Sequence, residues 1–396
     1  MAEKATREKD VLRGRMDAEP FTVFVDDAVL LDVQDRLRRT RWPVEPTAKP
    51  WRFGASQEYM KRVAAYWAHE YDWRRSEAAI NRFKNYRARI DELDVHFIME
   101  RGSGKNAKPL ILTHGWPGSI IEFLGVIEPL AHPERFGGHE DDAFTVIVPS
   151  IPGFAFSQAP SVPMSLRDVG RMWRSLMVDH LGFASFFAQG GDMGSIVSSW
   201  MAFEYPEHVA ALHINLASFV AAPPPDQQTS EEREWLAKNA EWRRPEDGYR
   251  TQQGTRPQTL AYALTDSPVG LAAWMIEKFH GWTVPGETRD PPFELDELLA
   301  NVMVYWIAGP NAASWFYISF IEDENARRLP EGESVKVPTG VLICPRDTNI
   351  PPPDSIIRRN YNLVRRVDAA RGGHFVALEQ PALFVDDVRT FFRAYR

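Results

Sequence analysis

The run Gly190-Gly191-Asp192-Met193-Gly194 has the residue types and the spacing of a nucleophile on a sharp turn. An apolar strand is predicted directly before it and a helix directly after it, which is the frame of a nucleophile elbow. Glycines on both sides of the apex allow the close backbone approach that such a turn needs. We therefore predict that the Asp192 carboxylate is the nucleophile, with capping of the next helix as the alternative. Ser195 lies beyond the apex, in the first helical turn, and is a poor candidate.

A nucleophile on such a turn needs a base and a residue that orients the base. Arg371-Gly372-Gly373-His374-Phe375 lies between the last predicted strand and the last predicted helix, so we predict that His374 is the base. A similar run, Gly137-Gly138-His139, precedes the elbow and breaks the chain order nucleophile, acid, histidine.

The orienting acid should follow the strand that precedes the histidine. Asp347 lies three residues after the apolar run Val341–Cys344 and 27 residues before His374, so we predict that it is this acid. A solvated surface carboxylate is the alternative for Asp347. Three other carboxylates fit less well, because they lie after a proline run, beside a strand or after the histidine: Asp354, Asp368 and Glu379.

A second loop is predicted to bind developing negative charge. His114-Gly115-Trp116-Pro117-Gly118 directly follows the apolar run Pro109–Thr113. In an elbow frame this loop supplies one backbone N–H to an oxyanion hole, and the residue after the nucleophile supplies the other. We assign these donors to Trp116 and Met193. A turn that only buries a tryptophan is the alternative.

An aspartate in place of a serine changes the reaction that the elbow can perform. A serine that attacked a saturated carbon would form an ether, which the enzyme could not hydrolyse. An aspartate forms an ester whose carbonyl belongs to the enzyme, and water activated by His374 can attack that carbonyl. The sequence therefore points to a strained or activated sp3 carbon, either in an epoxide or in an alkyl halide.

The leaving group separates these two reactions. Epoxide opening develops an alkoxide that takes a proton, and a phenol is a neutral donor at pH 7. Halide departure requires fixed N–H donors instead. Four tyrosines fall in the helix-rich stretch after residue 220, and most tyrosines there are expected to be packing residues, so residue type alone does not choose among them. They are Tyr249, Tyr262, Tyr305 and Tyr317.

The elements around these residues alternate between apolar strands and helices, which predicts a parallel sheet covered on both faces. The alternation stops near residue 220, and a helix-rich stretch follows to about residue 330. The sequence therefore predicts an α/β core with a helical insertion and an extension before it. We expect an N-terminal extension at 1–90, core at 91–220, a helical lid at 221–334 and core again at 335–396. A short strand is also expected at Phe21–Val25.

Composition excludes several classes of function. The formal net charge is −8, so binding to nucleic acid has no electrostatic support. A single cysteine, Cys344, excludes an internal disulfide and a cysteine-based zinc site. The charged N-terminus lacks the apolar stretch of a signal peptide, and no apolar run approaches the ~20 residues of a membrane span. We expect a cytoplasmic protein without a membrane anchor or bound metal.

Taken together, the chain resembles the microsomal-type epoxide hydrolases of the α/β-hydrolase superfamily, as a soluble member. The resemblance covers roughly residues 20–396. Its markers are Pro20-Phe21, Arg41-Trp42-Pro43, the loop His114–Ser119, the elbow Gly190–Ser195, the run Asp266–Trp274, and Gly372–Phe375.

The resemblance implies an α/β-hydrolase fold with a helical lid and an N-terminal extension that wraps the core and the lid. It implies hydrolysis of a small apolar epoxide with water to a vicinal diol, without a cofactor. It places the acid at Asp347 and the two tyrosines of the lid at Tyr249 and Tyr317.

Three alternatives or open questions accompany this interpretation. A haloalkane dehalogenase would use the same aspartate, but such enzymes place tryptophan after the nucleophile, where this chain has Met193. A catalytically silent fold that binds an apolar ligand would not need a complete triad. A homodimer is compatible with the sequence.

Overall fold

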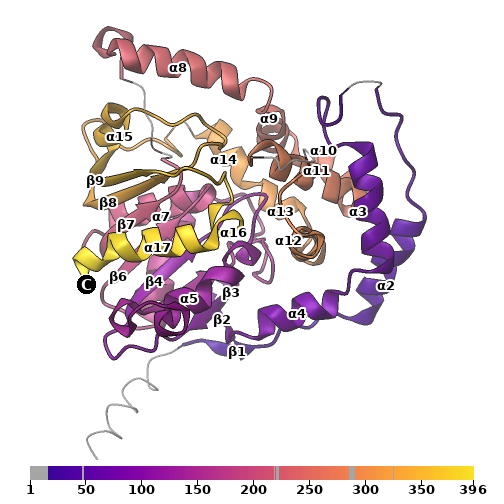
Figure 1. Ribbon diagram of the computed structural model, residues 1–396, viewed down its shortest axis with the longest axis horizontal. Coiled ribbons are helices and arrows are strands. Elements are labelled where there is room, and N and C mark those ends of the chain that lie inside the picture. Colours follow the sequence, from indigo (N-terminus) through magenta and orange to yellow (C-terminus); the bar gives the residue numbers. More distant parts are fainter. Residues whose placement is uncertain (1–16, 47–48, 218, 220–222, 285–289, 324) are drawn as a thin grey trace, which may run out of the picture.

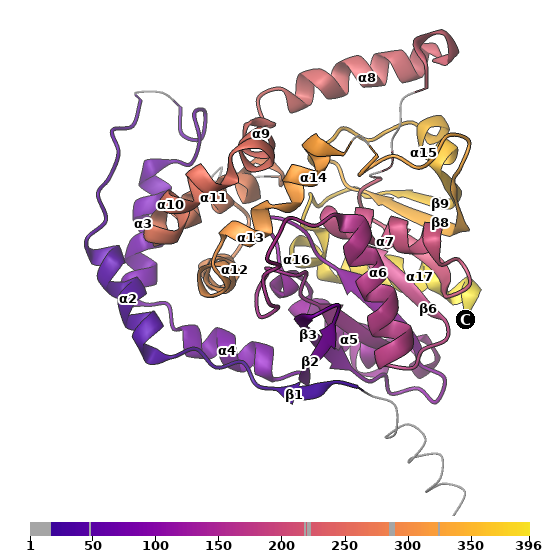
Figure 2. The same cartoon turned by 180° about the vertical axis from the view of Figure 1, so that it is seen from behind.

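One mixed sheet of nine strands organises the chain (Figures 1 and 2). The computed structural model describes residues 17–46, 49–217, 219, 223–284, 290–323 and 325–396. The strand order is β1-β2-β3-β5-β4-β6-β7-β8-β9. The strands are β1 (Glu19–Phe21), β2 (Asn85–Ile90), β3 (Leu93–Glu100), β4 (Lys108–Thr113), β5 (Phe144–Pro149), β6 (Phe186–Gly190), β7 (Val209–Ile214), β8 (Val335–Ile343) and β9 (Tyr361–Asp368).

The pairing divides the sheet into two parts. β1, β2, β3 and β5 pair as antiparallel neighbours, whereas β5, β4, β6, β7, β8 and β9 are parallel. All five residues of β6 are buried, as expected for a strand that is covered on both faces. The carboxyl ends of β4, β6, β8 and β9 lie at one edge, and each is followed by one of the four predicted site loops.

Helices cover both faces of the parallel part, as the alternating sequence pattern predicts. Figure 1 shows α5 and α17 in front of the sheet, and the reverse view in Figure 2 shows α6 and α7 in front of it. These helices and the short ones beside them have the following bounds: α5 (Leu124–Ala131), α6 (Leu166–Ser175), α7 (Met193–Glu204), α15 (Asp354–Asn360), α16 (Val376–Glu379) and α17 (Pro381–Phe392).

A helical insertion, defined here as α8 to α14, lies between β7 and β8. Thr229 caps α8 in a capping box with Glu232, and Ser267 caps α11 with Pro268 at its first position. Residues 220–222, at the predicted lid boundary, lie outside the described residues. The helices are α8 (Ser230–Arg243), α9 (Gly248–Thr255), α10 (Pro257–Asp266), α11 (Pro268–Gly281), α12 (Leu295–Ala308), α13 (Asn311–Ser314) and α14 (Phe316–Glu322).

The N-terminal part of the chain contacts both the sheet and the helical insertion. Its helices are α2 (Asp27–Arg38), α3 (Gln57–His69) and α4 (Trp73–Asn81). They pack against α11 and α12 along the side of the molecule that is far from β9 (Figures 1 and 2). β1 and β2 extend the sheet, and β2 pairs with β3 over its whole length. The sequence does not predict β2.

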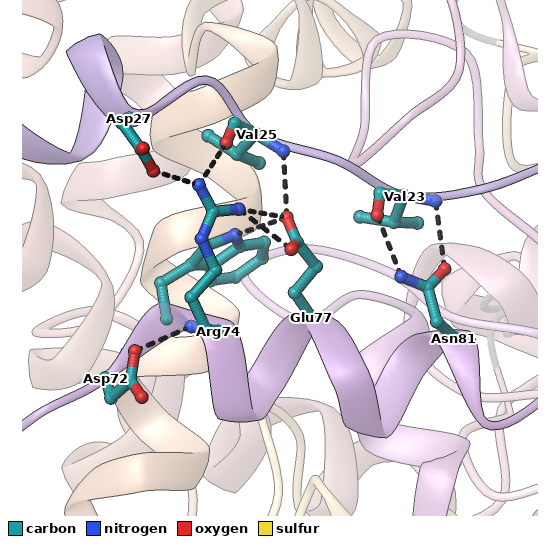
Figure 3. A network of polar contacts seen from close by, with 8 residues as sticks. Val23, Val25, Asp27, Asp72, Arg74, Glu77 and Asn81 are labelled. Atoms are coloured by element: carbon teal, nitrogen blue, oxygen red, sulfur yellow. Dashed lines mark hydrogen bonds and ion pairs between the residues drawn. The ribbon is translucent and has the colours of Figure 1, made fainter.

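The strand predicted at Phe21–Val25 is wrong beyond residue 21, because side chains of α4 take up the backbone groups that a strand would pair. Figure 3 shows this contact. Asn81 accepts the N–H of Val23 at 2.9 Å and donates to its carbonyl at 2.8 Å. Glu77 accepts the N–H of Val25 at 2.8 Å, and Arg74 donates to the Val25 carbonyl at 2.7 Å.

Two further sequence predictions concern the chain's surroundings. Residues 1–16, whose charge pattern argues against a signal peptide, lie outside the described residues. Within the part of the chain that the structure describes, no helix is both long enough and apolar enough to cross a membrane.

The elbow between β6 and α7 predicts a sharp effect of Gly194→Ala. A Cβ at residue 194 would lie 1.9 Å from the Thr113 carbonyl oxygen, so β4 or α7 would have to move. We expect a loss of about 3 kcal/mol in the free energy of unfolding. Urea titration measures it.

Gly125→Ala is the matched control, because no heavy atom lies within 4 Å of a Cβ built at that helical position. It should stabilise the protein by up to about 1 kcal/mol. Equal stabilities of the two variants would contradict the close crossing at the elbow.

Candidate active site

The Asp192 side chain is presented by a strained turn between β6 and α7. Its backbone has φ of +50° and ψ of −125°, which is the left-handed side of the map. A Cβ at Gly190 would lie 2.1 Å from the Gly194 carbonyl oxygen, so the turn closes only with glycine there. Strain at one such residue costs on the order of 1–3 kcal/mol, and it persists because the surrounding packing fixes the turn.

The loop after β4 holds one oxygen of this carboxylate. The backbone N–H of Trp116 donates to Asp192 Oδ1 at 2.8 Å. Gly115 is required for this approach, since a Cβ there would lie 2.1 Å from Oδ1. The side chain of Asp192 accepts no capping hydrogen bond from α7, so the predicted donor role of Met193 stays a prediction.

The same loop is bound from the far side by α12 of the helical insertion. The Asn301 amide donates to the Pro117 carbonyl at 2.7 Å, and the Tyr305 hydroxyl donates to the Gly118 carbonyl at 2.7 Å. Ser119 donates to the Asn301 side-chain oxygen, also at 2.7 Å. The insertion thus helps to orient the Trp116 N–H. The Tyr305 hydroxyl donates its proton to the loop for this purpose.

The second oxygen of Asp192 faces His374. The distance from His374 Nε2 to Asp192 Oδ2 is 3.3 Å, and that from His374 Nδ1 to Asp347 Oδ1 is 2.5 Å. Asp347 Oδ1 also accepts the N–H of Thr348 at 2.6 Å. His374 is 4% exposed and Asp347 is 7% exposed, so water screens these contacts little. The structure therefore brings the three residues of the predicted triad together in one line.

The loop that carries His374 is fixed on both sides of the histidine. Glu379 Oε1 accepts the N–H of Gly373 at 3.0 Å and that of Phe375 at 3.1 Å. The His374 N–H donates to the Trp282 carbonyl, just after α11, at 3.0 Å. Burial raises the pKa of Glu379 to about 7, and these backbone donors oppose the rise. Glu379 is therefore a support of the loop and not the acid that touches the imidazole.

Two carboxylates control the protonation of His374. Burial alone would lower its pKa, but the negative charges and hydrogen bonds of Asp347 and Asp192 outweigh burial and raise the pKa well above 6.5. The resting histidine is therefore an imidazolium near neutral pH. Neutralising either carboxylate would lower the pKa of His374 and favour the neutral imidazole.

A cluster of aromatic side chains lies near the Asp192 carboxylate. The rings of Tyr249 and Trp116 are stacked, with centroids 5.0 Å apart, and Tyr317 meets both rings edge-on. Burial, with the Asp192 charge contributing, raises the pKa of both phenols, so both stay protonated donors. The centroids of the two phenol rings lie 5.6 Å apart. Tyr262, by contrast, is 76% exposed on the surface.

Asp192 and the phenols of Tyr249 and Tyr317 line a cavity of about 90 Å³. Its wall includes Asp192, Met193, Tyr249, Trp282, Tyr317 and Arg327. The wall is therefore aromatic beside the nucleophile and charged farther along. Among the described residues, no group of three or more His, Cys, Asp or Glu side chains could hold a metal ion.

Family models match both parts of this architecture. The model described as the N terminus of epoxide hydrolases matches residues 18–123, and the model of the alpha/beta hydrolase fold matches residues 108–266. Epoxide hydrolase 1 of Sus scrofa is 35% identical over 94% of this chain and 88% of its own length. The chain belongs to the epoxide hydrolase family. A protein of Stigmatella aurantiaca with an epoxide hydrolase designation is 40% identical over 95% of this chain and 85% of its own.

Solved structures agree with this membership. The juvenile hormone epoxide hydrolase of Bombyx mori superposes with a TM-score of 0.84 at 26% identity, covering 98% of this chain and 97% of that one. The Aspergillus niger epoxide hydrolase gives 0.81 at 29% identity, covering 96% and 97%. The predicted α/β-hydrolase fold and the predicted family are thereby confirmed.

Competing residues of the sequence prediction lie elsewhere. Asp354 and Asp368 both pair with Arg366, away from His374. His139 lies on the surface beside Asp141. The sequence did not predict the supporting roles of Trp282, Asn301 and Glu379. Trp282 and Asn301 contact segments far away in the chain, whereas Glu379 was considered only as a competing acid and instead holds the nearby loop.

The electrostatics of the site predict the effect of Asp192→Asn. This change removes one of the two negative charges at His374, so the pKa of His374 should fall toward its ordinary value. Titration of the imidazole nitrogens by NMR, with His374→Gln for assignment, measures the shift.

Asp141→Asn is the control, since Asp141 is exposed and contacts a different histidine. It should leave His374 unchanged. An unaltered pKa of His374 in Asp192→Asn would contradict the coupling between the two side chains.

Proposed function

We propose that this protein hydrolyses epoxides to vicinal diols through a covalent ester on Asp192. The observation that carries the proposal is the division of labour between the two oxygens of that carboxylate. Oδ1 accepts from the Trp116 N–H, and Oδ2 lies near His374. Asp192 also lines the cavity that the two phenols line. Membership of the epoxide hydrolase family agrees with it.

In the first step, Asp192 Oδ2 attacks a ring carbon of the epoxide and the bond from that carbon to the ring oxygen breaks. The ring oxygen takes a proton from one of the paired phenols of Tyr249 and Tyr317, and the other phenol stabilises the resulting phenolate by a hydrogen bond. The product is an ester whose carbonyl oxygen, Oδ1, is already hydrogen-bonded to Trp116.

Ester formation also prepares the base for the second step. The ester carries no charge, so His374 loses one of the two charges that raise its pKa. The proton on Nε2 of His374 can then pass to the phenolate, so that Nε2 becomes a hydrogen-bond acceptor. Asp347 keeps the ring oriented through Nδ1.

In the second step, His374 takes a proton from water while the oxygen of that water attacks the ester carbonyl carbon. The Trp116 N–H stabilises the oxyanion, and Met193 is proposed as the second donor. Collapse expels the diol oxygen, which takes the second proton of the attacking water from the newly formed acid. Asp192 is thereby restored as a carboxylate, and His374 keeps the first proton as an imidazolium. Epoxide and water are consumed and one diol is formed.

The aromatic wall favours an apolar substrate body near the nucleophile, as the sequence predicts. Dehalogenation and silent binding, the alternatives from sequence, have no comparable support, because the paired phenols provide protons that halide release does not need. The ranges 1–90, 91–220, 221–334 and 335–396 remain our proposal for extension, core, lid and core. Cytoplasmic location and a homodimer likewise remain proposals from the sequence.

The covalent step predicts that His374→Gln accumulates the ester. Without the base, ring opening still proceeds but hydrolysis is slowed on the order of 10²–10⁴-fold. Intact-protein mass spectrometry after incubation with styrene oxide should show one added epoxide mass per chain.

Asp192→Ala should give no adduct under the same conditions. His139→Gln, at an exposed histidine, should turn over styrene oxide like the wild type. An adduct that persists in Asp192→Ala would show that another residue is alkylated.

The phenols predict a separate effect on ring opening. Tyr249→Phe and Tyr317→Phe should each lower kcat/KM on the order of 10²-fold, because the alkoxide loses a proton donor or its partner. Rates of adduct formation in the His374→Gln background isolate this step.

Tyr262→Phe is the control for the loss of a phenol in the insertion, since that side chain is exposed. It should change the rate by less than about twofold. Equal, small effects of all three substitutions would remove the phenols from the mechanism.

A further inference from the structure

The cavity beside Asp192 is not lined by aromatic side chains alone. Three arginines also line it, from α8, α9 and the segment between α14 and β8: Arg243, Arg250 and Arg327. An enzyme for purely apolar epoxides has no use for a guanidinium on this wall, because burying a charge next to an apolar substrate costs free energy.

Two of the arginines are occupied within the protein. Asp247 pairs with Arg250 on one side and with Arg243 at 3.1 Å on the other. The other carboxylate on this part of the wall, Glu246, pairs with Lys278 at 3.3 Å. Every carboxylate near the arginines therefore already has a cation.

Arg327 is different. Among the described residues, none makes a hydrogen bond or an ion pair with its guanidinium. The guanidinium carbon lies over the ring of Phe320, 4.6 Å from the ring centroid. Burial and the nearby charge of Arg243 lower its pKa, in the direction expected for a cation that lacks a counter-ion. Arg327 is thus a half-buried positive charge with unused donors.

The position of Arg327 is also fixed by its surroundings. Trp200, buried in α7, donates from its indole nitrogen to the carbonyl of Ala326 at 3.0 Å. Stacking on Phe320 holds the plane of the guanidinium, so little rotamer freedom is lost when it binds a ligand. Both anchors act on the residue before any substrate is present.

We propose that Arg327 is the binding site for the carboxylate of an epoxide that carries an acid group. The planar fork of an arginine matches a carboxylate in two parallel hydrogen bonds. The acid would lie on Arg327 while the epoxide lies between Asp192 and the two phenols. The inference rests on the proposed function and adds the class of substrate: epoxy acids rather than uncharged epoxides.

The test compares ω-epoxy alkanoates of increasing chain length with the matching ω-epoxy alkanamides, which differ only in charge at the far end. The wild type should prefer the acid at one chain length or more. Arg327→Met should lower kcat/KM for that acid about tenfold or more, through KM, and change the amide by less than about twofold. Arg327→Lys should recover part of the preference.

Arg328→Met is the matched control, because Arg328 is the exposed neighbour and does not line the cavity. It should leave both substrates unaffected. Equal losses for acid and amide in Arg327→Met, or preference for the amide at every length, would overturn the proposal.

A binding measurement separates this inference from the proposed function. Calorimetry with octanoate and octanamide needs no turnover, so it is informative even if no epoxide is hydrolysed. The wild type should bind octanoate more tightly than octanamide. Arg327→Met should bind octanoate about tenfold more weakly than the wild type does. Equal affinities for octanoate in the wild type and in Arg327→Met would contradict an acid site at Arg327.

Discussion

The carboxylate of Asp192 is fixed where three stretches of backbone approach so closely that none of them can carry a Cβ. A Cβ built at any of three glycines would lie 2.1 Å or less from a heavy atom of a neighbouring segment: Gly115, Gly190 and Gly194. This packing fixes the positive φ of Asp192 and points its two oxygens at different partners. If the crossing opened, Oδ1 would lose the Trp116 N–H, and Oδ2 would lose its place beside His374.

Charge is the second constraint, and it depends on the first. His374 lies between two carboxylates and is held protonated by both. In the proposed mechanism, alkylation removes the charge of one of them, so the step that forms the ester also makes the histidine available as the base that hydrolyses it. Such a switch needs contact distances in a buried site, because exposed charges would be screened.

The helical insertion contributes more than a cover to this site. α12 binds the loop that presents the Trp116 N–H, and the Trp282 carbonyl after α11 binds the loop that presents His374. The N-terminal helices pack on those same two helices, so the extension supports the site indirectly. The insertion also supplies both phenols and two arginines of the cavity wall, Arg243 and Arg250.

The central residues were predictable from sequence because each follows a strand within a short motif and in a fixed chain order. That holds for Asp192, Asp347, His374 and Trp116. The choice of Tyr249 and Tyr317 came from family resemblance, since four tyrosines had equal claims by residue type. The sequence could not predict β2, the end of β1 at Phe21, or the roles of Asn301 and Arg327. Contacts with segments far away in the chain decide each of these features.

The most direct test of the account is a single turnover in water enriched in ¹⁸O, with enzyme in excess over styrene oxide. If water attacks the ester carbonyl, the label should enter the carboxylate of Asp192, detected by mass spectrometry of the peptide that contains it, and the first diol released should be unlabelled. A labelled diol together with an unlabelled Asp192 would mean that water attacks the epoxide directly, and it would contradict the covalent mechanism.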